Sequence, residues 1–140
     1  MIEFDCKVIQ AALLSMATPD LRVQQEFYQR LLGQDPAVEI ANRYIEFRLT
    51  GLRLGIYSSH HPDFQAGLGS LSLCLQVTNL DAVMDGLAEA GIPTSPVRIA
   101  SHGREIDLQD PDGNRIVIHQ PSQEFWSRLR LPEPSNPRLE

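Results

Sequence analysis

The sequence contains 140 residues, of which 18 are acidic and 12 are lysine or arginine, so its formal net charge is −6. This length fits one compact domain, or two small modules that share a core. A hydrophobic fraction of 42% and a charged fraction of 21% exclude a wholly disordered chain. The negative charge argues against a nucleic-acid partner, because no basic patch would drive counterion release from a phosphate backbone.

The sequence also bears on membranes and on the cellular compartment. No apolar run approaches the ~20 residues that are needed to cross a bilayer, so a membrane partner is not expected. The two cysteines cannot build a disulfide framework, and the N-terminus lacks a charged segment followed by an apolar core. We therefore expect a reduced, cytoplasmic protein.

The first elements in chain order are a strand and a helix. Residues 7–17 predict the strand, and Thr18-Pro19-Asp20 predicts the start of the helix through a capping hydroxyl, a proline at the first helical position and an early acid. Apolar residues then recur at helical spacing from Leu21 to Leu32. Gly33 stands where a left-handed C-cap is expected to end the helix.

The same order of signals occurs a second time. Residues 70–77 predict a strand, Thr78-Asn79 provides a cap, and an apolar helical stripe runs from Leu80 to Ala88 before Gly91. An alternating hairpin follows each helix, and a short strand precedes each hairpin. The hairpins lie at 43–58 and 103–120, and the short strands at 37–41 and 95–100. The sequence therefore predicts an α+β fold made of two βαβββ modules, at about 7–58 and 70–120.

This repeated order resembles the vicinal-oxygen-chelate superfamily, which includes glyoxalase I, the bleomycin- and fosfomycin-resistance proteins and the extradiol dioxygenases. The resemblance runs from about residue 8 to residue 120, and three stretches carry it: TPDLRVQQEFYQRLLG, SLCLQVTNLDAVMDGLAEAGI and GREIDLQDPDGNRIVIHQ. It implies a glyoxalase-like fold in which the two modules form one domain over residues 1–121, with a curved mixed sheet around a cup. A homodimer is also expected, and residues 122–140 are expected to be a partly mobile C-terminal extension.

Alternation along each strand separates an apolar face, expected to meet the helices, from a polar face. The polar face of the first module carries Tyr44, Glu46, Arg48, Arg53 and Tyr57. The polar face of the second carries Ser72, Cys74, Gln76, Asp107 and Arg115, and a loop adds Arg104. In one interpretation these residues bind a ligand, with arginines for an anionic group and aromatic rings for an apolar part. In the other, the face is simply hydrated and its charges are solvated or paired across strands.

The resemblance also implies four metal-ligand positions, one near the start and one near the end of each module. They fall on Leu13, Gly55, Ser72 and Val117. None of these side chains suits a divalent ion, so no cofactor is expected. An alternative is a divalent metal at a non-standard site that uses His119 with one or both of Glu105 and Glu46.

Three residues near the second hairpin are candidates for catalysis: His102, Glu105 and His119. His102 lies in a loop that leads into the hairpin and could act as an acid or base near neutral pH. Glu105 is expected opposite His119 on the neighbouring strand. The alternative is that both histidines are structural, and that Cys74 is a small filler rather than a nucleophile.

Three functions therefore remain open. The first is a metal-free protein that binds a small anionic or amphiphilic molecule in the polar cup. The second is an enzyme, either a lyase, isomerase or dioxygenase-like protein with a displaced metal or a metal-free acid–base catalyst. The third is a dimeric adaptor that keeps the fold without chemistry. The polar cup favours the first function, because an adaptor does not require one.

Overall fold

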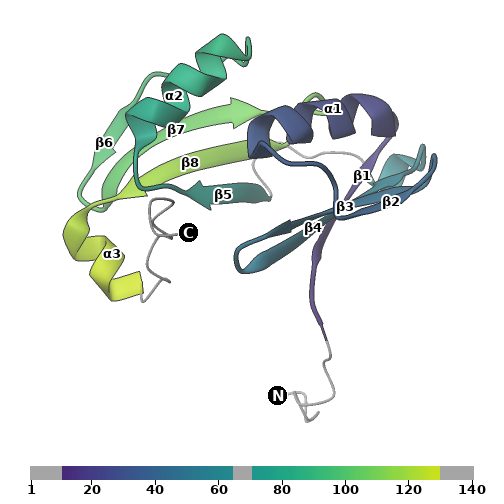
Figure 1. Cartoon of the computed structure of the whole chain (residues 1–140), viewed down its shortest axis with the longest axis horizontal. Helices are drawn as coiled ribbons and strands as arrows, with labels where there is room; N and C mark the ends of the chain where they lie inside the picture. The colour runs from purple at the N-terminus through teal and green to yellow at the C-terminus, as the bar shows by residue number, and fades with distance from the viewer. Residues whose placement is uncertain (1–10, 65–70, 130–140) are drawn as a thin grey trace. The chain divides into compact units, whose positions relative to one another are not determined.

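A computed structural model of the chain describes residues 11–64 and 71–129. The chain forms two compact units, residues 1–66 and 67–140, and each unit has a four-stranded sheet of its own. Both units have the order strand, helix, and three further strands (Figure 1). This confirms the predicted α+β fold of two βαβββ modules. In the part of the chain that the structure describes, no helix is long and apolar enough to span a membrane.

The first unit consists of one four-stranded mixed sheet with one long helix. Its elements are β1 (Leu14–Thr18), α1 (Leu21–Leu32), β2 (Val38–Ile40), β3 (Tyr44–Leu49) and β4 (Leu52–Ser58), followed by a short 3-10 turn (Pro62–Phe64). The strand order is β1-β4-β3-β2, with β1 parallel to β4 and the other pairs antiparallel. The parallel pair arises because α1 carries the chain back across the sheet before the hairpin forms.

The second unit repeats this sheet and adds a C-terminal helix. Its elements are β5 (Ser72–Gln76), α2 (Leu80–Glu89), β6 (Arg98–Ala100), β7 (Gly103–Gln109), β8 (Arg115–Pro121) and α3 (Gln123–Leu129). The strand order is β5-β8-β7-β6, with β5 parallel to β8. Residues 130–140 of the predicted C-terminal extension lie outside the described part of the chain, as does the predicted strand segment before residue 11.

The start of α1 differs from its prediction. Thr18 is the last residue of β1, and the N-cap is Asp20, whose carboxylate accepts a hydrogen bond from the Val23 amide at 3.2 Å. The Thr18 hydroxyl instead accepts a hydrogen bond from the Asp20 amide at 3.1 Å. A carboxylate two residues nearer to the helix reaches its unpaired N–H groups, which the Thr18 side chain does not. The C-cap at Gly33 is left-handed, with φ +64°, as predicted.

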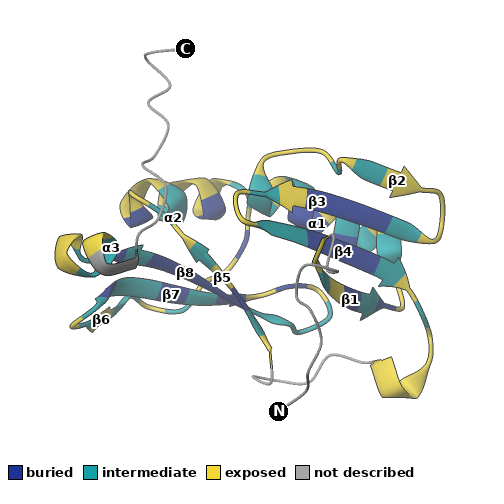
Figure 2. Ribbon diagram, turned by 90° about the horizontal axis from the view of Figure 1, so that it is seen from below, coloured by how far each residue is buried: buried dark blue, intermediate teal, exposed yellow. Residues whose placement is uncertain are grey.

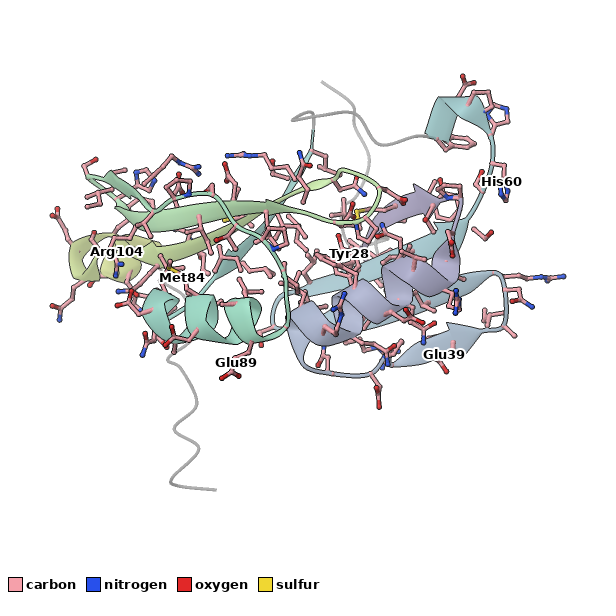
Figure 3. The ribbon with its side chains drawn as sticks, turned by 90° about the horizontal axis from the view of Figure 1, so that it is seen from above. Tyr28, Glu39, His60, Met84, Glu89 and Arg104 are labelled. Carbon is pink, nitrogen blue, oxygen red and sulfur yellow. The ribbon has the colours of Figure 1, made fainter. Side chains whose placement is uncertain are left out.

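The apolar face of each sheet forms the core beneath its helix. In the first unit, Tyr28 of α1 points to the sheet (Figure 3) and is fully buried, as are Phe47 and Leu54. In the second unit, Leu80 of α2 and Ile106 of β7 are fully buried. Figure 2 shows buried residues running along β3, β4 and β8. Because one face of each sheet is fixed against a helix, the alternate residues must occupy the opposite face.

Candidate functional site

The polar face of the second unit brings residues of three strands into rows. Within the hairpin of β7 and β8, Glu105 pairs with His119 and Asp107 pairs with Val117. On the other side of β8, Gln76 of β5 pairs with His119. Paired residues on one face of a sheet have side chains that lie side by side. The strand register therefore places Gln76, His119 and Glu105 in a single row across the sheet.

His102 joins this row from the turn that leads into β7. One ligand atom each from His102, Glu105 and His119 lies within 4.8 Å of the others, and we call this group the His102–Glu105–His119 cluster. His102 Nε2 is 3.8 Å from Glu105 Oε2. The two imidazole rings have their centres 5.0 Å apart. The structure thus brings together the three residues that the sequence suggested for catalysis.

His119 is the most deeply buried member of the cluster, with 4% of the residue exposed. Its Nδ1 is 3.4 Å from the Gln76 amide nitrogen, while its Nε2 has no hydrogen-bond partner among the described residues. Leaving a buried polar atom unpaired costs about 1–3 kcal/mol. The cluster therefore contains a nitrogen atom whose bonding capacity is unused.

Gly103 allows the backbone to pass close to this nitrogen. Its φ is +144°, and a Cβ built at this residue would lie 2.9 Å from His119 Nε2 and would also collide with the Gln120 carbonyl oxygen. Only glycine adopts such a backbone conformation readily. Any other residue at this position would press against the unpaired imidazole nitrogen.

An aromatic side chain from α3, which the sequence did not indicate for this site, packs against both histidines. The Phe125 ring centre is 5.7 Å from that of His102 and 6.0 Å from that of His119. Ser122 begins the helix by accepting a hydrogen bond from the Phe125 amide, and its own amide donates to the His102 carbonyl oxygen at 2.9 Å. A serine cap followed by aromatic residues predicts a helical turn, but nothing in that pattern says which face the turn covers.

A charged network occupies the rest of this polar face. Arg98 of β6 donates to Glu105 Oε1 at 3.0 Å and to both oxygens of Asp107, at 2.6 and 2.9 Å. Arg115 donates to Asp107 Oδ1 at 3.1 Å and to the Ser72 hydroxyl at 3.2 Å. The hydrogen bonds from Arg98 lower the pKa of Asp107, against the opposing effect of burial. Arg98 was missed because the sequence places it on a short strand without fixing that strand's register.

An open cavity of ≈ 690 Å³ adjoins this network, and its lining includes Asp107 and Arg115. The remaining lining comes from residues 93–95, which precede β6, and from residues 108–110 at the end of β7. The volume is in the range of small-molecule sites. Two of the predicted ligand-binding residues therefore face a space that can hold a ligand.

The polar face of the first unit carries a separate network centred on Glu46, which is 2% exposed. Arg53 donates to Glu46 at 2.7 and 3.2 Å, the Tyr44 hydroxyl donates at 2.8 Å, and Arg48 donates at 3.4 Å. The hydrogen bonds from Arg53 and Tyr44 lower the pKa of Glu46 to about 2, and burial raises the pKa of Tyr44. The two guanidinium groups and the single carboxylate leave this network with one surplus positive charge.

The other predicted ligand-binding residues lie in different surroundings. Arg104 is on the α2 side of β7 (Figure 3), where it donates to Asp81 at 3.0 Å, so it does not reach the polar face as expected. Alternation explains this, because Arg104 shares its side of β7 with Ile106. Cys74 is exposed, and partial desolvation together with nearby Glu105 raises the pKa of its thiol. The Tyr57 ring packs 6.5 Å from that of Phe64.

The four positions at which the resemblance implies metal ligands do not fit a metal. A Cβ built at Gly55 would lie 2.6 Å from the Tyr44 hydroxyl and 2.8 Å from Leu13 Cδ1, so these two side chains fill the space that a ligand side chain would need there. Leu13 has no donor atom. In the second unit, the Ser72 hydroxyl accepts a hydrogen bond from Arg115, and Val117 offers no donor.

A comparison with protein families gives one match. Residues 10–118 match the model of the Glyoxalase/Bleomycin resistance protein/Dioxygenase superfamily. The chain belongs to this superfamily. This confirms the resemblance drawn from the two helix entries and the DPDGN hairpin. A search of curated proteins finds no match.

Solved structures show the same fold. A glyoxalase/bleomycin resistance protein from Catenulispora acidiphila is 26% identical, with a TM-score of 0.65 over 79% of this chain and 97% of that chain. The fosfomycin resistance protein FosX from Listeria monocytogenes is 18% identical, with a TM-score of 0.70 over 88% and 99%. A lactoylglutathione lyase from Agrobacterium tumefaciens is 14% identical, with a TM-score of 0.65 over 84% and 97%. The FosX and lyase likenesses concern the fold alone, since a shared fold does not assign chemistry.

Proposed function

We propose that this protein binds a small anionic or amphiphilic molecule on the polar face of its second unit, without a metal at the superfamily's usual positions. The observation that carries the proposal is the cavity of ≈ 690 Å³ into which Asp107 and Arg115 face. Its lining combines the Arg115 guanidinium group, two carboxylates, two hydroxyl groups, an amide and the apolar residues Pro93 and Leu108. Such a mixture of a few polar groups with apolar surface is typical of small-molecule sites.

Arg115 is the group that would hold the anionic part of the ligand. A guanidinium group has five N–H donors, and the described contacts of Arg115 use two of its nitrogen atoms, toward Asp107 and Ser72. Arg98 already donates hydrogen bonds to both oxygens of Asp107, so Arg115 is not the only cation that compensates the negative charge of Asp107. Arg115 therefore keeps donors for a carboxylate, phosphate or phosphonate group of a ligand.

Calorimetric titration with a panel of short-chain carboxylates and alkylphosphonates tests this proposal. We expect at least one anion to bind, and Arg115→Gln to weaken its binding roughly tenfold or more, because a charge-assisted hydrogen bond is lost. Arg22→Gln is the matched control, since Arg22 is exposed on α1 and pairs only with Glu26 in the described contacts. Equal affinity of the Arg115→Gln variant, or loss of binding in Arg48→Gln instead, would overturn the assignment.

A second candidate is an enzyme, and the His102–Glu105–His119 cluster favours it. Two imidazoles beside a carboxylate can move protons in a lyase or isomerase reaction. If turnover is found on a metabolite panel, we expect His102→Ala and His119→Ala to abolish it, and unchanged rates in both variants would remove this candidate.

The function of an adaptor without chemistry and the homodimeric state both remain predictions. Sedimentation analysis would test the homodimer, and a cavity that binds none of the panel would favour the adaptor.

A further inference from the structure

We propose that His102, Glu105 and His119 form a binding site for a divalent transition-metal ion within the second unit. None of the three occupies a position at which the superfamily resemblance implies a metal ligand. The site uses β7, β8 and the turn between β6 and β7, so it needs no residue from the first unit. It is also separate from the cavity that Asp107 and Arg115 line.

The distances within the cluster suit a site that closes around an ion. The three ligand atoms lie within 4.8 Å of one another, and His102 Nε2 is 3.8 Å from Glu105 Oε2. In a tetrahedral site with bonds of about 2.0–2.1 Å, ligand atoms are roughly 3.4 Å apart. The His102 side chain is 42% exposed, so its ring can turn to bring its ligand nitrogen closer to the other two ligand atoms.

His119 supplies the strongest indication of a missing ligand. Its Nε2 is buried and has no hydrogen-bond partner among the described residues. The Gln76 amide lies 3.4 Å from Nδ1 on the other side of the ring. As placed, the amide nitrogen is the atom nearest Nδ1, and a hydrogen bond from it would leave the proton on Nε2. Turning the amide by 180° brings its oxygen to that position, where it accepts the Nδ1 proton and leaves Nε2 with a free lone pair. A hydrogen bond of this kind commonly fixes the tautomer of a metal-binding histidine.

The surroundings of the cluster favour an ion over a bulky group. Gly103 places no side chain against Nε2, and Phe125 packs against both rings with an apolar surface. Glu105 Oε1 is held by Arg98, which leaves Oε2 directed to His102. The positive charge of Arg98 is offset by its two hydrogen bonds to Asp107. These partners orient the ligands in the way that outer residues do at known metal sites.

The donor set indicates the class of ion. Two imidazole nitrogens and one carboxylate oxygen suit Zn²⁺, Co²⁺, Ni²⁺ or Fe²⁺, whereas Mg²⁺ and Ca²⁺ prefer oxygen ligands. Three protein ligands leave a coordination position for water or another molecule. Because a neutral histidine pair and one carboxylate carry a single negative charge, binding of a divalent ion leaves the site with a net charge of about +1.

Titration of untagged, chelator-treated full-length protein with Zn²⁺ tests the site. We expect one equivalent to bind, with affinity reduced roughly a hundredfold or more in His102→Ala and in Glu105→Gln, since even outer residues alter affinity by about 10–100-fold. His60→Ala is the matched control, because His60 is exposed and lies outside the cluster. Absence of stoichiometric binding, or an equal loss in His60→Ala, would refute the proposal.

A second measurement needs no variant and so cannot fail through misfolding. The sequence contains four histidines, at positions 60, 61, 102 and 119. Nitrogen NMR of their imidazole rings should show that Zn²⁺ shifts Nε2 of His119 and a ring nitrogen of His102, with the other two rings unchanged. Shifts confined to His60 and His61 would instead assign the ion to the exposed pair and overturn the proposal.

Discussion

Substitution of Gly55 by alanine should destabilise the first unit, although glycine is normally the less stable choice within a strand. A Cβ at this position would lie 2.6 Å from the Tyr44 hydroxyl, 2.9 Å from a Tyr44 ring carbon and 2.8 Å from Leu13 Cδ1. Carbon atoms pack at about 3.5–4.0 Å, so the new methyl group requires movement of both neighbours. Tyr44 resists that movement because its hydroxyl donates to buried Glu46 at 2.8 Å.

The expected loss follows from two opposing effects. Insertion of a methyl group into a filled space typically costs about 1–3 kcal/mol. Replacement of glycine by alanine within a strand returns about 0.5–1 kcal/mol, because the unfolded chain becomes less flexible. The free energy of unfolding of Gly55→Ala should therefore fall by about 1–2 kcal/mol.

Urea denaturation of four proteins tests the steric explanation: wild type, Gly55→Ala, Tyr44→Ala and the double variant. Removal of the Tyr44 ring makes room for the methyl group, so we expect the two effects to be non-additive by about 1–2 kcal/mol. Gly86→Ala is the control, because a Cβ there has no neighbour within 4 Å and α2 should gain about 0.5–1 kcal/mol. A fully stable Gly55→Ala protein, or additive effects in the cycle, would refute the idea that Tyr44 fills the space that a side chain at position 55 would need.

Three other predictions concern stability. The folded-state pKa of Glu46 is about 2, below its ordinary value of 4.5. Its ion pair with Arg53 therefore contributes its full stabilisation at pH values above about 4.5. This contribution should be lost as the pH falls from about 4.5 to 2, and Glu46→Gln should show a smaller loss over that range. Asp110→Ala should cost about 2–3 kcal/mol, because the carboxylate accepts three hydrogen bonds from Asp112 and Asn114. Asn79→Ala removes the N-cap of α2 and should cost about 1 kcal/mol.

Urea midpoints measured at several pH values check the first of these predictions, and urea unfolding at neutral pH checks the other two. An unchanged acid profile in Glu46→Gln would show that Glu46 does not drive the acid transition. A cost below about 0.5 kcal/mol for Asp110→Ala would place it with ordinary surface changes and contradict the role given to its hydrogen bonds. For Asn79, the conservative variant Asn79→Ser should retain most of the stability, because serine also caps helices.

Much of the fold was available from local patterns in the sequence. The spacing of apolar residues predicts the same order of strand, helix and hairpin in residues 70–120 as in the first module. Alternation also assigned residues such as Glu105 and His119 to one face, because successive side chains of a strand must point to opposite sides. The start of α1 was misplaced by two residues, since Thr18 and Asp20 are both good caps and only the path of the chain selects between them.

The tertiary structure decided which of these polar groups meet. The sequence placed His102 in a loop and Phe125 in an extension, whereas the register of β7 and β8 and the position of α3 bring both against His119. It also could not show that Arg98 would bind Asp107 while Arg104 turned to Asp81. The face to which a strand side chain points is a local property, because successive residues alternate between the two faces. The pairing of charges depends on distances between segments that are far apart in the chain, and only the folded sheets set those distances.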